Sequence, residues 1–234
     1  MNFKNKIFFF ISILASVLFT YESLTAATIE SRIKEFGTEA RQRWAPYFKK
    51  ASVSYPPDNV VLYYTKSKRI LEVFATPRGE KKIKSIRSLN VLAASGVMGP
   101  KLKEGDNQVP EGLYRIELLN PNSAFHVSLR VSYPNAFDRQ KALLDKRQRL
   151  GGDIMIHGSR VSIGCLAMGD EVAEDLFTLA VDAPFKNWKL ILSPVDFRTE
   201  RIHNSSLVKL PKWTPELYKI LKDEIALLPT LAFM

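Results

Sequence analysis

The spacing of hydrophobic residues predicts a chain in which short strands outnumber helices. Apolar side chains recur every three or four positions over residues 28–51, which predicts an amphipathic helix. The same spacing predicts helices over 170–181, with Asp170 as the N-cap, and from Thr214, which is followed by a proline. Runs rich in β-branched and aromatic residues predict the strands. These are expected at 60–64, 69–75, 85–95, 113–119, 125–133, 154–156 and 188–192.

Segments rich in glycine, proline or charge separate these elements. Residues 99–112 hold three glycines and two prolines, which predicts a shaped surface loop. Its charged side chains either line a cleft or are simply solvated. Residues 120–123 predict a turn between two strands. The basic segment 139–150 is expected to be helical or irregular.

The order of elements predicts a mainly β architecture with peripheral helices, of the α+β class. The length of 234 residues allows one sizeable domain with appendages. Prolines at Pro46, Pro56 and Pro57 mark a boundary before the first strands. We therefore expect four segments: a leader (1–27), an N-terminal helical segment (28–57), a central domain (58–198) and a C-terminal extension with a helix (199–234).

The leader has the three parts of a secretory signal. Lys4 and Lys6 precede an apolar run over residues 7–21, and small residues follow at 25–27. The run is too short for a comfortable membrane span. We expect export to the periplasm, cleavage after Ala27 and no stable membrane span in the mature protein. An uncleaved N-terminal anchor is the alternative.

The composition is that of an ordinary globular protein, with 46% hydrophobic and 25% charged residues. The net charge of +10 raises the question of nucleic acid. No basic run is interleaved with aromatic residues in a recognisable binding motif, and the leader directs the chain out of the cytosol, so we expect no nucleic acid partner. A basic surface suits an anionic envelope polymer, and a plain solvated surface is the alternative.

Candidate chemistry is concentrated in residues 151–170, which hold the only cysteine, Cys165, and one of three histidines, His157. A thiol is a strong nucleophile only as the thiolate, and a nearby imidazole favours that form. Glycines at Gly158 and Gly164 allow backbone N–H groups to approach a substrate carbonyl, as an oxyanion hole requires. The leader predicts export to a compartment where disulfides form. A chain with a single cysteine cannot form an internal disulfide there.

Structural explanations for the same residues stay open at this point. A lone cysteine is most often a small buried hydrophobe, and a histidine at a strand end is most often structural. The other histidines are His126, on an expected strand, and His203, in a polar segment to which we assign no role. The sequence shows no phosphate-binding glycine fingerprint and no spacing typical of zinc ligands.

Several short motifs favour the chemical interpretation of these residues over the structural one. His157-Gly158 is followed by Ser162-Ile163-Gly164-Cys165, and further matching segments occur upstream. Together they resemble the L,D-transpeptidase catalytic domain family (YkuD-like), closest to its YafK-like murein branch, over residues 60–198. The upstream segments are Gly99-Pro100-Lys101, Glu104-Gly105-Asp106, Pro110-Glu111-Gly112 with Tyr114, and Tyr133-Pro134-Asn135 with Asp138.

Two positions depart from the wider family pattern. Ile163 stands where a histidine usually precedes the Gly-Cys pair, and Ala167 stands where an arginine usually follows it. Only eight positions separate His157 from Cys165, which predicts a short loop between base and nucleophile. An arginine contact to a substrate carboxylate must therefore come from another part of the chain.

The resemblance implies a β-sandwich-like catalytic fold and acyl transfer through a Cys165 thioester, with His157 as the base and Ser162 and Gly164 completing the catalytic set. It implies substrate contacts near His126, Gly158, Lys101 and Tyr133, with no metal and no organic cofactor. The implied partners are peptidoglycan stem peptides, attacked at a diaminopimelate carbonyl, and lipoprotein linked to the wall. Transfer to an amine and hydrolysis are both open. A catalytically inactive peptidoglycan-binding module is the alternative, whereas papain-like and NlpC-like peptidases place cysteine before histidine.

Overall fold

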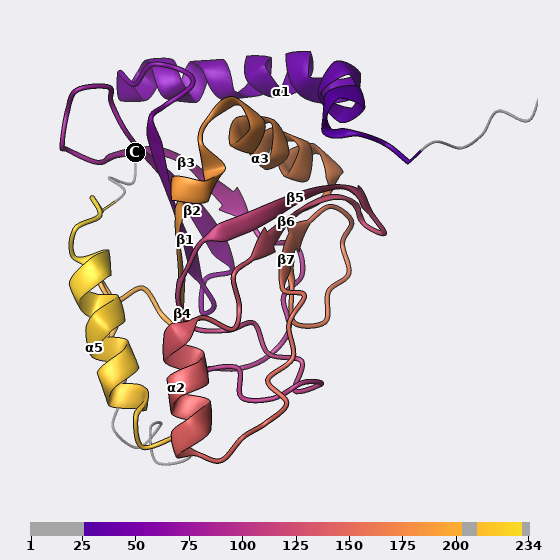
Figure 1. The fold of residues 1–234 in the computed structure, drawn as a ribbon. Coiled ribbons are helices and arrows are strands. Elements are labelled where there is room, and N and C mark those ends of the chain that lie inside the picture. Colours follow the sequence, from indigo (N-terminus) through magenta and orange to yellow (C-terminus); the bar gives the residue numbers. More distant parts are fainter. Residues whose placement is uncertain (1–25, 203–209, 231–234) are drawn as a thin grey trace, which may run out of the picture.

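Two β-sheets share the main hydrophobic core of the protein. The computed structural model describes residues 26–202 and 210–230 (Figure 1). The first sheet has the strand order β3-β2-β1-β9-β4, and the second has the order β5-β6-β7-β8. The strands of the first sheet are β1 (Asn59–Thr65), β2 (Ile70–Thr76), β3 (Lys84–Asn90), β4 (Gly112–Tyr114) and β9 (Lys189–Ser193). Those of the second are β5 (Ile116–Ser123), β6 (His126–Val131), β7 (Met155–His157) and β8 (Leu166–Ala167).

Helices cover both sides of the first sheet. The helices are α1 (Ile29–Ala51), α2 (Ala136–Leu144), α3 (Asp170–Asp182) and α5 (Thr214–Ile225), with a short 3₁₀ turn at η1 (Phe185–Asn187). In Figure 1, α1 lies across α3 above the sheets, and α5 runs along the outer side of β1 and β2. The expected α+β class with two sheets is therefore confirmed.

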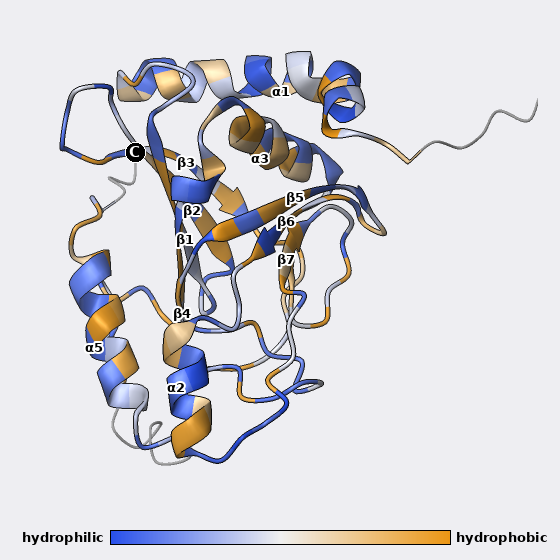
Figure 2. Ribbon diagram, in the orientation of Figure 1, coloured by the Kyte–Doolittle hydropathy of each residue, from blue (hydrophilic) through white to orange (hydrophobic). Residues whose placement is uncertain are grey.

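The burial of β1 explains why its sequence is apolar at successive positions. Val60, Leu62 and other alternate residues face the main core, which both sheets share with α1 and α3. Val61 and Tyr63 point to the opposite side, where they pack with α5. A strand covered on both faces has no solvent side, so its sequence loses the alternation of polar and apolar residues. In Figure 2, much of the length of the central strands is accordingly coloured orange, for hydrophobic residues.

Helix α1 is held to the rest of the fold by its cap, its apolar face and ion pairs. The Thr28 hydroxyl accepts from the N–H of Ser31 in a capping box, which fixes the start of the helix. Trp44 is fully buried, and its Nε1 donates to the Asp175 carbonyl at 2.8 Å. The Asp175 carboxylate bonds Arg43 on α1 at 2.6 Å. The predicted N-terminal helix thus packs directly on α3.

Most of the predicted elements are confirmed, but several boundaries are wrong. The single strand expected over 113–119 is divided at Arg115 into β4 of the first sheet and β5 of the second. The strand expected over 85–95 ends at Asn90 because the N–H groups of Leu92 and Ala93 bond to the Ala167 carbonyl of the second sheet. The turn expected over 120–123 lies at residues 124–125, because β5 continues to Ser123. The N-cap of α3 is Gly169, since Asp170 already has helical backbone and its carboxylate accepts from Ser159.

The segment around 139–150 becomes partly helical, and the helix begins earlier than expected. α2 begins at Ala136, where Asn135 and Asp138 form a capping box. The Tyr114 hydroxyl, 3.1 Å from an Asp138 oxygen, fixes this helix to β4. Burial raises the pKa of Asp138 to about 6. The chain leaves α2 from this corner and returns to β7.

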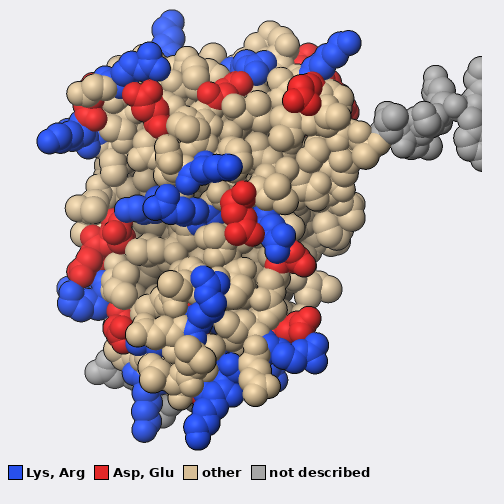
Figure 3. Space-filling model, viewed as in Figure 1, with Lys and Arg blue, Asp and Glu red and all other residues tan. Residues whose placement is uncertain are grey.

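The charged surface is mixed rather than uniformly basic. Figure 3 shows Lys and Arg side chains across the middle and lower part of this face, with Asp and Glu side chains among them. Within residues 26–202 and 210–230, no helix is long and apolar enough to span a membrane. Residues 1–25 of the expected signal, and His203, lie outside the described part of the chain.

Candidate active site

The second sheet carries the two residues for which we expect chemistry. β7 ends at His157, and Cys165 directly precedes β8. The two strands run parallel, with His157 opposite Ala167. Met155 is two positions before His157, and Cys165 is two positions before Ala167. The Met155 N–H donates to Cys165 Sγ at 3.4 Å. Cys165 lies in the bend just before β8, so this bond places the thiol beside the strand that ends in His157.

The imidazole of His157 is held in one orientation. Its Nδ1 lies 2.6 Å from the Gly158 carbonyl oxygen. A carbonyl only accepts, so Nδ1 carries the proton and Nε2 is left as the basic nitrogen. A Cβ at Gly158 would lie 2.8 Å from the Phe125 carbonyl and 2.5 Å from Asp170 Oδ1, which explains why a glycine stands there. Gly158 therefore serves to orient the histidine through its carbonyl.

Phe125 covers the imidazole, and sequence analysis did not identify it. The two ring centroids are 4.7 Å apart with planes tilted by 30°. His157 is only 2% exposed, whereas Phe125, in the turn before β6, is 42% exposed. Burial lowers the pKa of His157 below its usual range, although the bond to the Gly158 carbonyl opposes this shift. No sequence signal indicated this role, because Phe125 was predicted as the first residue of a strand.

Replacing Phe125 with alanine is expected to raise the pKa of His157 toward its ordinary value. Removal of the ring admits water to the imidazole and relieves the burial that disfavours the cation. An NMR titration of ring-labelled histidine, with His157→Gln used to assign the resonance, measures this pKa without any substrate. Phe125→Leu keeps an apolar cover and should retain most of the lowering. An unchanged pKa in Phe125→Ala would show that the ring does not shield the base.

The thiol of Cys165 is protonated in the resting protein. Burial raises its pKa, the hydrogen bond from Met155 N–H opposes this, and the charge of Asp153 adds to the increase. Sγ also lies 3.6 Å from the Asp153 carbonyl oxygen, to which the thiol donates. Because the pKa of His157 is lowered and that of Cys165 is raised, the two groups rest as neutral imidazole and neutral thiol. In this arrangement the imidazole is available as a proton acceptor.

Ser162 and Gly164 have roles in the backbone around the thiol. The Ser162 hydroxyl donates to the Cys165 carbonyl at 2.7 Å and accepts from the Cys165 N–H at 3.0 Å. The Gly164 N–H donates to the Ser95 hydroxyl at 2.6 Å, and Gly164 has φ +84. The N–H groups of Gly164 and Cys165 are therefore bonded to serine hydroxyls, and that of Gly158, the other glycine expected near an oxyanion, donates to the Val127 carbonyl at 3.3 Å. Ser95 was not identified from the sequence, since it comes from the segment that was predicted as strand.

A cavity of about 270 Å³ opens beside the thiol loop. Two of the expected substrate contacts lie at or behind its wall. The Lys101 ammonium, 7% exposed, bonds Asp106 at 2.6 Å, and the Tyr133 hydroxyl bonds the Leu150 carbonyl at 3.2 Å. Their polar ends thus hold the loop in shape. The cavity is lined by Lys101, Glu104, Gly105, Asn107, Gly151, Gly152, Asp153, Ile154, Ile163 and Gly164.

His126 points away from the thiol, contrary to our expectation of a contact near it. Its backbone has φ +74, which breaks the alternation at the start of β6. Its Nε2 lies 3.0 Å from Glu174 on α3, and its ring lies 5.8 Å from that of Phe36 on α1. The side chain therefore joins the sheet to the two helices. A histidine on a strand carries no sequence signal for such a reversal of direction.

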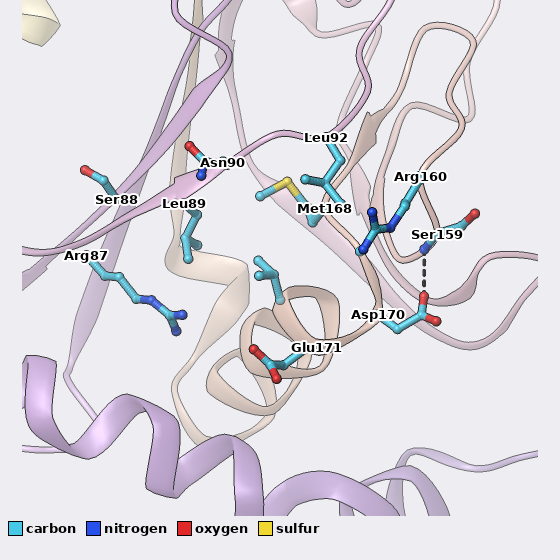
Figure 4. Close-up of a pocket in the computed structure, with 12 residues that line it drawn as sticks. Arg87, Ser88, Leu89, Asn90, Leu92, Ser159, Arg160, Met168, Asp170 and Glu171 are labelled. Atoms are coloured by element: carbon cyan, nitrogen blue, oxygen red, sulfur yellow. Dashed lines mark hydrogen bonds between the residues drawn. The ribbon is translucent and has the colours of Figure 1, made fainter.

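A second, larger pocket of about 600 Å³ lies on the other side of the loop 158–164 (Figure 4). Ser159 and Arg160 of the loop face the start of α3 there, and the Ser159 N–H donates to the Asp170 carboxylate at 2.7 Å. Leu92 and Met168 form its apolar side. Among the described residues that line this pocket, neither Cys165 nor His157 occurs. Neither residue lines the smaller cavity, but that cavity includes Gly164, the neighbour of Cys165, and Asp153, whose carbonyl contacts the thiol.

A single thiol beside a buried, oriented imidazole is typical of cysteine enzymes that work by acyl transfer. The model of the L,D-transpeptidase catalytic domain family, YkuD, matches residues 53–185 of this chain. The chain therefore belongs to the L,D-transpeptidase catalytic domain family. Membership supports a general role in transpeptidase or hydrolase chemistry on peptidoglycan.

Known relatives match part of the chain. YafK of Escherichia coli strain K12, named as an L,D-transpeptidase, is 32% identical over 126 residues, which cover 53% of this chain and 48% of YafK. The chain thus spans about half the length of the curated relatives it matches. The helical cell shape determining protein Pgp2 of Campylobacter jejuni is 25% identical, with 61% of this chain and 49% of Pgp2 covered and a TM-score of 0.48. Bd1075 of Bdellovibrio bacteriovorus is 19% identical, with 72% and 57% covered and a TM-score of 0.41.

Proposed function

We propose that this protein is a cysteine acyltransferase or hydrolase that acts on peptidoglycan stem peptides at a diaminopimelate carbonyl. The observation that carries the proposal is the position of the Cys165 thiol beside β7, the strand that ends in His157. The bond from Nδ1 of His157 to Gly158 leaves Nε2 free to take a proton. Family membership supports the wall as the place of action.

The proposed reaction has two acyl transfers. His157 Nε2 takes the proton of the Cys165 thiol while sulfur attacks the carbonyl carbon. The tetrahedral intermediate expels the amine, which receives that proton from His157, and a thioester remains on Cys165. An incoming water or amine then gives its proton to His157 and attacks the thioester, and the proton returns to sulfur. Water makes the protein a hydrolase, and an amine makes it a transpeptidase.

The developing oxyanion requires donors that rearrange from their resting bonds. The N–H groups of Gly164 and Cys165 are bonded to the hydroxyls of Ser95 and Ser162. Each hydroxyl is an acceptor that can rotate away, which releases an N–H toward the substrate oxygen. The same two bonds favour the alternative function, an inactive peptidoglycan-binding module, because they occupy the donors that catalysis needs.

The expected export signal supports action in the periplasm, and wall-linked lipoprotein is a second proposed substrate. Cleavage at the diaminopimelate carbonyl that joins such a lipoprotein to the wall uses the same thioester chemistry. The amine that leaves is then a side chain of the lipoprotein rather than part of a neighbouring stem.

Trapping the thioester tests the proposal directly. The protein is incubated with lipoprotein-linked, diaminopimelate-type peptidoglycan, quenched in acid, and examined by intact-protein and peptide mass spectrometry. We expect an acyl adduct on the peptide that contains Cys165, with new cross-links or amine exchange for a transpeptidase and freed stems or lipoprotein for a hydrolase. Bound wall fragments with no adduct and no product would contradict catalysis and favour the binding module.

A further inference from the structure

The sheet that carries His157 beside the thiol also carries one basic side chain. In the antiparallel pair of β6 and β7, Ser128 lies opposite His157 and Arg130 lies opposite Met155. Met155 in turn lies beside Cys165. Arg130 therefore lies across β7 from the thiol, and both groups contact Asp153: the thiol its carbonyl at 3.6 Å and Arg130 Nη2 its carboxylate at 3.1 Å. Two strand spacings place the β6 and β8 positions about 10 Å apart.

Arg130 has hydrogen-bonding capacity that its neighbours do not fill. Its Nη2 lies 3.1 Å from Asp153 and its Nε 3.0 Å from Glu117, yet Nε makes no hydrogen bond of acceptable geometry within the described chain. The Arg130 side chain is 37% exposed, although its Nε is buried, and the side chains of its partners Glu117 and Asp153 are 44% and 78% exposed. Exposed ion pairs of this kind are weak. A planar guanidinium has five N–H donors, so it can donate to a further carboxylate in addition to Glu117 and Asp153.

Two other positions near the thiol do not offer a cation to a substrate. Lys101 is buried and bonded to Asp106. Position 167, where the family pattern carries an arginine, is a fully buried alanine whose carbonyl accepts from Leu92 and Ala93. Among the residues of β6, β7 and β8, Arg130 is the only lysine or arginine. The acyl-enzyme site therefore has one cation placed across the strands from the nucleophile.

We propose that Arg130 binds a free carboxylate of the donor peptide and so selects an acyl residue that carries a negative charge beyond the attacked carbonyl. This inference rests on the proposed function. A diaminopimelate residue has carboxyl groups at opposite ends of its chain. With its reacting carbonyl at Cys165, the chain lies across Met155, and its far carboxylate meets the guanidinium of Arg130 in a charge-assisted, bidentate contact.

Paired substrates test this assignment. Two stem peptides are compared, one with the far carboxylate of diaminopimelate free and one with it converted to the carboxamide. We expect the wild-type protein to favour the free carboxylate by about tenfold to hundredfold in kcat/KM, chiefly through KM. Arg130→Met should remove this preference, lower kcat/KM for the carboxylate peptide by a similar factor, and leave the carboxamide peptide within about threefold. Arg130→Lys should restore part of the preference, because it keeps the charge but not the fork.

Two further variants separate recognition from structural support. Arg78→Met removes an exposed arginine that pairs with Asp58 at 3.3 Å, and it should keep the full preference. Glu117→Gln removes a neighbour of Arg130 while leaving the guanidinium, and it should keep or strengthen the preference. If Glu117→Gln and Arg130→Met both lose activity equally on the two peptides, Arg130 is structural and the inference is wrong.

Failure of the inference is distinguishable from failure of the proposed function. Equal turnover of both peptides by the wild-type protein would overturn the role of Arg130 and leave the thioester chemistry intact. Turnover of neither peptide, with no adduct on Cys165, would overturn the proposed function and the inference with it. A preference that survives in Arg130→Met would assign carboxylate recognition to another residue.

Discussion

Replacement of Cys165 with alanine is expected to abolish product formation from peptidoglycan substrates, by a factor on the order of 10⁴ or more. Cys165 is the only cysteine in the chain, so no second thiol can take its place. Its sulfur bonds only a backbone N–H and a backbone carbonyl, and the side chain is partly exposed. The loss of these weak contacts should change the free energy of unfolding by less than about 1 kcal/mol. Chemical denaturation followed by circular dichroism measures the stability, and product analysis by mass spectrometry measures the rate.

A neighbour of His157 in the second sheet provides the matched control for that substitution. Ser128 is buried opposite His157, and its hydroxyl makes only a weak contact with the Met155 sulfur at 3.8 Å. Ser128→Ala should keep product formation within about threefold, because it removes a small side chain that has no part in the proposed transfer. If Cys165→Ala retained wild-type rates, the thiol would not be the nucleophile. Equal losses in both variants would indicate disturbed packing instead.

Replacement of His157 with glutamine is expected to lower kcat/KM by a factor on the order of 10³. Glutamine fills a similar volume and has an amide that can donate to the Gly158 carbonyl, but it cannot take a proton from the thiol. The protonated thiol of the resting site would then depend on hydroxide for its ionisation, since burial raises the pKa of Cys165. The residual rate of His157→Gln should therefore increase with pH through the alkaline range. Steady-state kinetics on a stem peptide give both the loss and its pH dependence.

The wild-type protein is expected to have a different pH profile from His157→Gln. Neutral His157 is the active form, and burial lowers its pKa, so the imidazole stays unprotonated to a lower pH than an exposed histidine. The acid limb of kcat/KM should accordingly have its midpoint below the ordinary histidine range, with a plateau above it. His157→Gln should lack this limb. An acid limb that is identical in both proteins would assign the titration to another group and contradict the role of His157 as base.

Local patterns were sufficient for the elements whose burial is regular along their own sequence. The helix spacing around Trp44 and the apolar run of β1 predicted α1 and β1 closely, because periodicity reports which residues are buried within one element. The boundaries that were wrong lie where a distant segment takes over the hydrogen bonds. β3 ends early because Leu92 and Ala93 bond to Ala167, far along the chain.

The sequence by itself determined the family, the α+β class and the pair Cys165 and His157, because these depend on short motifs and on local spacing. Only the tertiary structure decided which other side chains lie near them. The parallel register of β7 with β8 and the antiparallel register of β6 with β7 place Arg130 across β7 from the thiol. A turn from another hairpin places Phe125 over the imidazole, and a reversed backbone directs His126 to the helices instead. Strand register and chain direction depend on pairing between distant segments. They are fixed by which residues the whole core buries, and the residues of one strand alone do not specify them.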